Sequence, residues 1–129
     1  MSDKAANNAP VKKSITFLSR YAPYGRDNSQ LCLEMALACA VFEQNVNYVF
    51  LDDGVYQLVG AQNASAIDAK TLGNALETLE LYGIENICVD EGSLNRRNLT
   101  AKDLLTECKL VNRSLITALI RQSDCVFNL

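Results

Sequence analysis

The sequence contains no histidine among its 129 residues. This absence excludes histidine-based catalytic triads, histidine proton shuttles and histidine metal ligands. The glycine-rich phosphate-binding patterns GxGxxG and GxxxxGK(S/T) are also missing, so nucleotide binding has no support. The five cysteines are odd in number and include no CxxC spacing. They therefore indicate neither a disulfide framework nor a zinc cluster.

The sequence also lacks a strong charge excess and a long hydrophobic run. Lysine and arginine total 12 against 15 acidic residues, and the resulting net charge of -3 provides no basic patch for phosphate contacts. The longest apolar-rich run, Leu31–Phe42, is interrupted by Glu34 and is too short to span a bilayer. The segment Met1–Lys13 lacks the apolar stretch of a signal peptide. We therefore expect a cytoplasmic protein with no direct contact to nucleic acid or membrane.

The remaining composition is that of one globular domain. Hydrophobic residues make up 49% and charged residues 21%, close to globular averages. Residues 1–12 are polar and carry no periodicity, which predicts a flexible N-terminal tail before a single domain at 13–129.

Strand-like and helix-like patterns alternate along this domain. The expected strands cover residues 14–19, 46–51, 86–89, 107–111 and 124–129. The expected helices cover residues 29–43, with one face at Leu31, Met35, Ala38, Cys39 and Phe42, then 72–79, ending near Gly83, and 115–121. This order predicts an α/β fold: a mostly parallel five-stranded sheet with helices on both faces, in flavodoxin-like layers.

Polar residues mark the expected helix ends and loops. Asn28 or Ser29 is expected to cap the first helix, and Thr100 with Asp103 resembles a capping box. Residues 90–98 are predicted to form a polar loop. Because loops 21–28, 52–54 and 90–98 all follow strands, they should gather at the carboxyl edge of the sheet.

Cys88 is the main candidate for chemistry. It lies near the end of a predicted strand, where a thiolate could accept sulfur as a persulfide, and Arg96 and Arg97 could lower its pKa. Asp90 and Glu91 would act in the opposite direction. A buried core cysteine is the competing interpretation, because cysteine is among the most buried residue types.

Three weaker candidates have ordinary alternatives. Loop 21–29 could bind an anion at a helix N-terminus, or could be an interface or a plain connection. Asp52 and Asp53 could hold a hard cation, or could form a simple turn. Arg96 and Arg97, together with Lys102, could contact RNA, or could lie in a solvated loop. We therefore expect no metal and no cofactor; a flavin site would rest on fold analogy alone.

Several segments together resemble the DsrE/DsrF-like sulfur-relay family. They are Ala22-Pro23-Tyr24-Gly25, Val49 to Leu58, Leu81 to Glu85, Ser93 to Leu99 and Asp124 to Phe127. The resemblance implies a five-stranded α/β domain that assembles with TusB-like and TusD-like subunits as a heterohexamer. Such a complex passes persulfide sulfur, by way of a downstream acceptor protein, towards 2-thiouridine at the tRNA wobble position. A related DsrEFH-type complex serves sulfur oxidation instead.

The resemblance also bears on Cys88. In this family the sulfur-bearing cysteine belongs to the TusD-like subunit, on a strand that ends in Asn-Ile-Cys-Val. Residues 86–89 match that piece, whereas Asp90 and Glu91 replace small residues. We therefore expect an accessory subunit that is not an enzyme by itself, with a direct sulfur carrier through Cys88 as the alternative.

An accessory subunit needs interfaces. The helix 29–43 is apolar over most of its surface, and surplus apolar surface is normally covered by a partner. The interface candidates are Tyr24 and Arg26 in the preceding loop, with Leu33 and Leu37 on the helix.

Overall fold

A computed structural model describes residues 12–23, 27–59, 77–104 and 108–129. Its centre is a five-stranded, all-parallel sheet in the order β4-β3-β2-β1-β5. The strands are β1 Ser14–Ser19, β2 Asn45–Phe50, β3 Asn86–Asp90, β4 Lys109–Val111 and β5 Cys125–Asn128. The described helices are α2 Asn28–Val41, η1 Asp52–Leu58, α4 Glu91–Arg96, η2 Ala101–Asp103 and α5 Arg113–Gln122. The predicted α/β class and parallel five-stranded sheet are confirmed.

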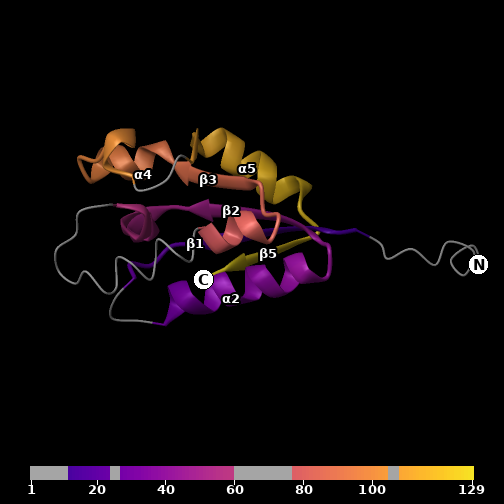
Figure 1. Cartoon of the computed structure of the whole chain (residues 1–129). Helices are drawn as coiled ribbons and strands as arrows, with labels where there is room; N and C mark the ends of the chain where they lie inside the picture. The colour runs from indigo at the N-terminus through magenta and orange to yellow at the C-terminus, as the bar shows by residue number, and fades with distance from the viewer. Residues whose placement is uncertain (1–11, 24–26, 60–76, 105–107) are drawn as a thin grey trace, which may run out of the picture.

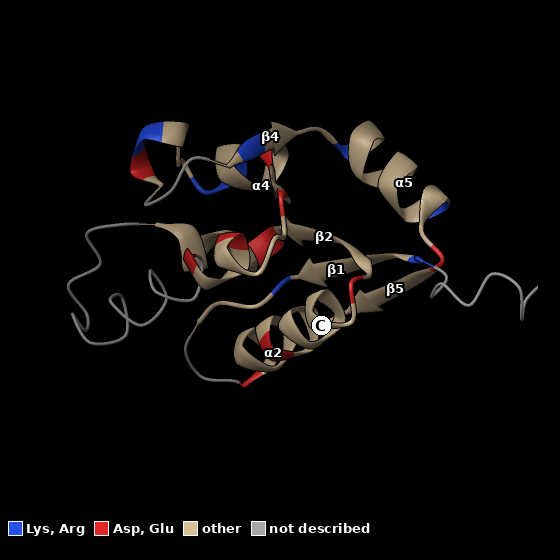
Figure 2. Ribbon diagram, turned by 45° about the vertical axis from the view of Figure 1, so that its right-hand side comes forward, with Lys and Arg blue, Asp and Glu red and all other residues tan. Residues whose placement is uncertain are grey.

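The sheet has a helix layer on each face. Because side chains alternate along a strand, neighbouring residues enter opposite layers. Phe17 and Tyr48 belong to one core with α2, whereas Leu18 and Cys88 belong to a second core with Ile116 of α5. In Figures 1 and 2 the strands run between α2 below and α5 above, which confirms helices on both faces.

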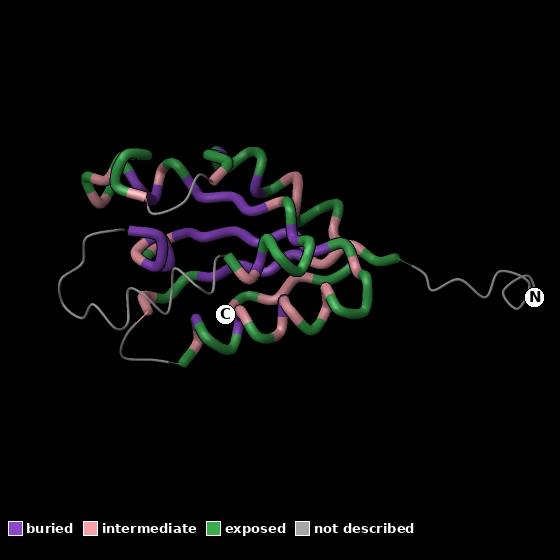
Figure 3. Tube along the Cα trace, in the orientation of Figure 1, coloured by how far each residue is buried: buried purple, intermediate pink, exposed green. Residues whose placement is uncertain are grey.

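Helix α2 buries a different face from the predicted one. The buried residues are Ser29, Cys32 and Ala36, whereas Leu31 is half exposed and Phe42 is 73% exposed. The predicted face was wrong because apolar residues surround this helix, so their spacing marks no single buried side. The predicted cap was also wrong: Asp27 occupies the N-cap position, and no side chain caps the helix. Figure 3 shows that the buried segments are concentrated in the strands.

The predicted polar loop at 90–98 was also wrong, because residues Glu91–Arg96 form helix α4. This helix is anchored by Leu94, which is only 2% exposed in the α2-side core. The capping box was confirmed: the backbone N–H of Thr100 donates to Asp103 Oδ2 at 2.8 Å. Residues 77–81 are helical and end before Gly83, which has a φ of 86°. The start of that helix lies outside the described residues.

Candidate functional site

The carboxyl ends of β1, β2 and β3 carry an arginine–aspartate cluster. We use this name for Arg20, Asp52, Asp53, Asp90, Ser93, Arg96, Arg97 and Arg113. Helix α4 packs against η1 at this edge, and Figure 2 shows acidic and basic segments together there. The expected gathering of segments 21–28, 52–54 and 90–98 is confirmed for the last two, which are helical here (η1 and α4), whereas residues 24–26 of the first lie outside the described residues.

Asp52 connects the first two strands. Its carboxylate accepts a hydrogen bond from Arg20 Nε at 2.9 Å, and Arg96 Nη2 lies 3.8 Å from the other oxygen. Asp52 has a φ of 52°, in the left-handed region that aspartate tolerates better than most residues. The turn after β2 therefore holds this carboxylate between arginines from two other elements.

Asp90 is the buried centre of the cluster, with 1% of its surface exposed. Its Oδ2 accepts a hydrogen bond of 2.7 Å from Ser93 Oγ and lies 3.7 Å from Arg113 and 4.0 Å from Arg96. Ser93 Oγ also accepts from the backbone N–H of Asp52 at 2.8 Å. A buried carboxylate needs such partners, and here they join the ends of β2 and β3.

Arg97 forms an ion pair with Asp53. Its Nε and Nη2 both donate to Asp53 Oδ1, at 3.1 and 2.9 Å, and Nη1 donates to the backbone oxygen of Ser93. Arg97 is only 20% exposed. These contacts fix the start of η1 against α4 and leave the Arg97 guanidinium little freedom to turn elsewhere.

Cys88 lies in the α5-side core and is 1% exposed. Burial raises the pKa of its thiol, and the positive charge of Lys109 on β4 offsets part of that rise. The predicted partners Arg96 and Arg97 pair with carboxylates, so Lys109 is the cation that acts on the thiol. A neutral, buried thiol is a poor nucleophile, because sulfur transfer requires the thiolate.

A chain of polar side chains leads from Cys88 across the sheet. The thiol donates to Asn86 Oδ1 at 3.5 Å, and Asn86 Nδ2 donates to Asn47 Oδ1 at 2.6 Å. Asn47 Nδ2 in turn donates to Thr16 Oγ1 at 3.1 Å. These residues occupy register positions on β3, β2 and β1, so neighbouring strands satisfy one another's buried polar groups.

The predicted interface residues fall into two groups. Leu33 and Leu37 are half-buried and pack against the α2-side core, whereas Tyr24 and Arg26 lie outside the described residues. Among the residues that the structure describes, the exposed large apolar side chains are others. They are Tyr21, Leu31, Val41, Phe42, Leu81, Tyr82, Leu110, Leu115 and Ile120.

Sequence reasoning missed the roles of Arg20, Asp90, Ser93 and Arg113. The roles of Arg20 and Asp90 could have been predicted, because each residue follows a predicted strand and so lies at the carboxyl edge of the sheet. Arg113 carries no such signal, because its partner Asp90 is remote in sequence, and Ser93 carries none for its contact with Asp52, which is 41 residues away. Among the residues that the structure describes, no three acidic or cysteine side chains are grouped closely enough to hold a metal ion. No helix in the same residues is long and apolar enough to cross a membrane.

Comparison with known proteins relates this arrangement to a family. Residues 13–129 match the DsrE/DsrF-like family. The intracellular sulfur oxidation protein DsrF of Allochromatium vinosum is 36% identical, over 92% of this chain and 97% of its own. A TusC homolog of Vibrio vulnificus is 31% identical, over 84% of this chain and 92% of its own.

The fold comparison agrees. The crystal structure of the ychN protein from E. coli aligns with a TM-score of 0.76 at 17% identity, covering 92% of this chain and all of that one. Identity at that level shows the shared fold alone. The sequence matches carry the assignment further and confirm the resemblance drawn from the residues: this chain belongs to the DsrE/DsrF-like family.

Proposed function

We propose that the protein is an accessory subunit of a sulfur-relay complex, in which it builds interfaces and does not itself carry the sulfur. The observation that carries this proposal is the burial of Cys88 beneath α5, together with the raised pKa of its thiol. A sulfur carrier must present a thiolate to a donor persulfide. In this conformation the sulfur of Cys88 is buried, and the raised pKa keeps its thiol protonated.

The proposed partners are TusB-like and TusD-like subunits in a heterohexamer that acts in the cytoplasm. The TusD-like subunit supplies the sulfur-bearing cysteine, and the relayed sulfur moves through an acceptor protein towards 2-thiouridine at the tRNA wobble position. The similarity to TusC homologs supports this destination. The exposed apolar side chains support assembly, because large exposed apolar residues such as Phe42 and Leu81 favour contact with a partner.

A DsrEFH-type sulfur-oxidation complex is the second candidate. The 36% identity to a protein named for intracellular sulfur oxidation favours it. Deletion of the gene in its host separates the two: loss of 2-thiouridine from hydrolysed tRNA supports the first destination. Loss of growth on reduced sulfur compounds, with 2-thiouridine unchanged, supports the second.

The role of the chain is tested by intact-mass analysis of the complex reconstituted with its TusB-like and TusD-like partners. After incubation with a persulfide donor, we expect an adduct of about 32 Da, one sulfur atom, on the partner chain and none on this one. Cys88→Ser should leave the partner adduct unchanged. Cys125→Ser is the matched control, because Cys125 is exposed and reports incidental sulfuration.

An adduct on this chain that disappears in Cys88→Ser and persists in Cys125→Ser would make Cys88 a direct carrier. In that step the Cys88 thiolate attacks the outer sulfur of the donor persulfide, the S–S bond breaks, and the donor leaves as its own thiolate. Failure of this chain to assemble with either partner would instead overturn the accessory-subunit role.

A further inference from the structure

The five cysteines differ in how far solvent reaches them. Cys32 and Cys88 are buried, Cys39 and Cys108 are half-buried, and Cys125 is exposed. The exposed cysteine lies on the edge strand β5, and Cys39 lies in the last turn of α2. Neither the arginine–aspartate cluster nor the proposed function assigns a role to these two thiols.

The backbone brings the end of α2 and the start of β5 to the same place. The N–H of Gln44 donates to the backbone oxygen of Cys39 at 3.1 Å, which closes the helix. Strand β2 begins at the next residue, whose N–H donates to the backbone oxygen of Lys13 at 2.8 Å. The N–H of Asp124, just before β5, donates to the backbone oxygen of Ser14 at 2.7 Å. Both segments therefore attach to the first residues of β1.

Cys125 belongs to the face of the sheet that α2 covers. It pairs in register with Ile15, and Ile15 and Phe127 pack against the α2-side core. Residues two apart on a strand share a face, so Cys125 lies on the same side of the sheet as Phe127. Because β5 is the edge of the sheet, this cysteine remains open to solvent.

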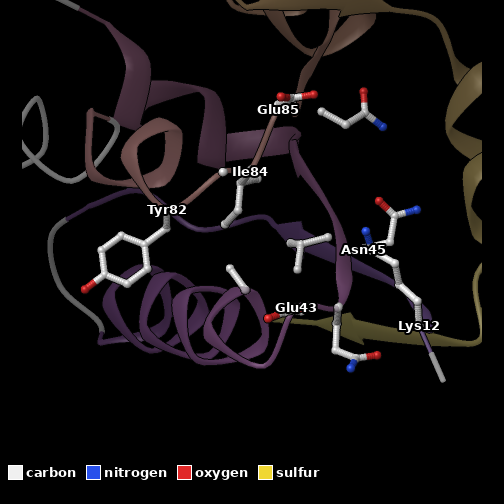
Figure 4. Close-up of a pocket in the computed structure, with 11 residues that line it drawn as sticks. Lys12, Glu43, Asn45, Tyr82, Ile84 and Glu85 are labelled. Atoms are coloured by element: carbon white, nitrogen blue, oxygen red, sulfur yellow. The ribbon is translucent and has the colours of Figure 1, made fainter. Parts of the chain in front are cut away.

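Cys39 lies on the flank of α2 that is nearer to β5. At 3.6 residues per turn, Cys39 lies about 60° to one side of buried Ala36, and Ala40 lies about 40° to the other side. Ala40 lines a pocket with Tyr82 and Ile84, which lead into β3 (Figure 4). The opposite flank of the helix, which carries Cys39, is therefore the one towards β1 and β5.

The two thiols also interact electrostatically. Burial raises the pKa of the Cys39 thiol, and the negative charge of the Cys125 thiolate raises it further. An accessible thiol beside a second, less accessible one is typical of a reversible dithiol site. The accessible sulfur reacts first, and its neighbour then displaces the group that was added.

We propose that Cys39 and Cys125 form a reversible thiol–disulfide site that reacts with small disulfides. The Cys125 thiolate attacks one sulfur of the small disulfide, whose S–S bond breaks, and one half leaves as a thiolate. The Cys39 thiolate then attacks the sulfur of Cys125 and expels the other half. Two protein thiols are oxidised and one small disulfide is reduced, and the two protons that the protein loses go to the leaving thiolates. The new bond joins the last turn of α2 to β5, and its formation requires no partner subunit.

The test treats the reduced, full-length chain with glutathione disulfide, blocks the remaining thiols with iodoacetamide and maps the peptides by mass spectrometry. In the wild type we expect a bond between Cys39 and Cys125, and an unblocked sample should be lighter by about 2 Da, two hydrogen atoms. Dithiothreitol should restore the original mass. The oxidised chain should also melt at a higher temperature, because the bond closes a long loop.

Three variants separate the two steps of the reaction. Cys125→Ser should form no bond, whereas Cys39→Ser should stop with one glutathione on Cys125, because no second thiol displaces it. Cys108→Ser is the matched control, because Cys108 is half-buried as Cys39 is. It should form the bond at a rate within about twofold of the wild type.

The wild-type peptide map decides the proposal, even where a variant does not fold. A wild-type chain that keeps glutathione on Cys125 while Cys39 remains free would overturn it. A bond between two chains through Cys125, or loss of the bond in Cys108→Ser, would do the same. These results leave the proposed function untouched, since that function is tested by assembly and by the adduct on the partner chain.

Discussion

Gly54 offers the sharpest test of how the turn after β2 is held. The added methyl group of Gly54→Ala would lie 1.9 Å from the backbone oxygen of Ser19 and 2.8 Å from its carbonyl carbon. These are main-chain atoms at the end of a buried strand, so no side-chain rotation can relieve the clash. The turn and β1 must separate if the substitution is to be accommodated.

The required movement sets the size of the effect. Ordinary contact begins at 3.4 Å, so the gap must widen by about 1.5 Å. That movement disrupts the hydrogen bond from Leu51 N to Ser19 O, now 3.1 Å, and displaces the Asp52 carboxylate from Arg20. One hydrogen bond contributes about 1 kcal/mol and overpacking costs roughly 1–3 kcal/mol. We expect a loss of about 3 kcal/mol in the free energy of unfolding, a large share of the usual 5–15 kcal/mol.

Two other glycines provide controls in a urea-unfolding series. Gly83 has a φ of 86° but open space around it, so Gly83→Ala should cost only about 1 kcal/mol, from the left-handed backbone. At Gly92 the nearest atom is the flexible end of Arg96, at 3.4 Å, so Gly92→Ala should be nearly neutral. If Gly54→Ala unfolded at the same urea concentration as Gly92→Ala, the close approach of the turn to β1 would be refuted.

Three further predictions concern thiols and carboxylates. Iodoacetamide should label exposed Cys125 quickly and buried Cys88 slowly, as peptide mass spectrometry would show; rapid labelling of Cys88 in the folded chain would contradict its burial. Burial raises the pKa of Cys108 from 9.0 to about 11, so the folded state holds this proton more tightly and stability falls as pH rises from 9 to 11. The urea midpoint of Cys108→Ala should fall less over that range, and an equal fall would disprove the assignment. Asp90→Asn should lower the free energy of unfolding by roughly 2–3 kcal/mol, because Asp90 is buried. Asp53→Asn should lower it by less than about 1 kcal/mol, because Asp53 is exposed. Equal losses for the two variants would show that burial does not set the cost.

The strands were predictable because each one carries its own signal. Ser14–Ser19 has the predicted bounds, and Asn45–Phe50 begins one residue before the expected position. Such runs are rich in residues that favour a pleated, buried surface, and turn-forming residues limit them. Alternation with helices then fixes the sheet as parallel, since only a crossover connection can return the chain in the same direction.

Helix α4 and the buried face of α2 could not be predicted in the same way. Helix α4 has only six residues, fewer than two turns, so two buried neighbours, Ser93 and Leu94, replace any periodic pattern. In α2 the reverse holds, because apolar residues occupy every side. The sheet contacts decide the outcome, and they bury the small side chains of Ser29, Cys32 and Ala36. Both errors therefore arise from tertiary contacts that local spacing does not record.

The partners of the site residues were hidden for a related reason. Arg96 and Arg97 stand near Cys88 in sequence, and that proximity suggested a thiolate stabilised by arginine. Carboxylates take both arginines instead: Arg97 pairs with Asp53, which is 44 residues away along the chain, and Arg96 faces Asp52 and Asp90, while Cys88 lies in the α5-side core. Charge near a cysteine in sequence is therefore weak evidence for charge near its sulfur.

The charged residues at the two ends of the sheet have different surroundings. At the carboxyl end, every aspartate of the arginine–aspartate cluster faces an arginine, so those charges chiefly hold strands and turns together. At the amino end, Glu43 and Glu85 are exposed and line a pocket together with Lys12, and no ion pair joins them to any residue that the structure describes. The charges at the two ends of the sheet therefore act differently: those at the carboxyl end hold strands and turns together, whereas those at the amino end remain in solvent.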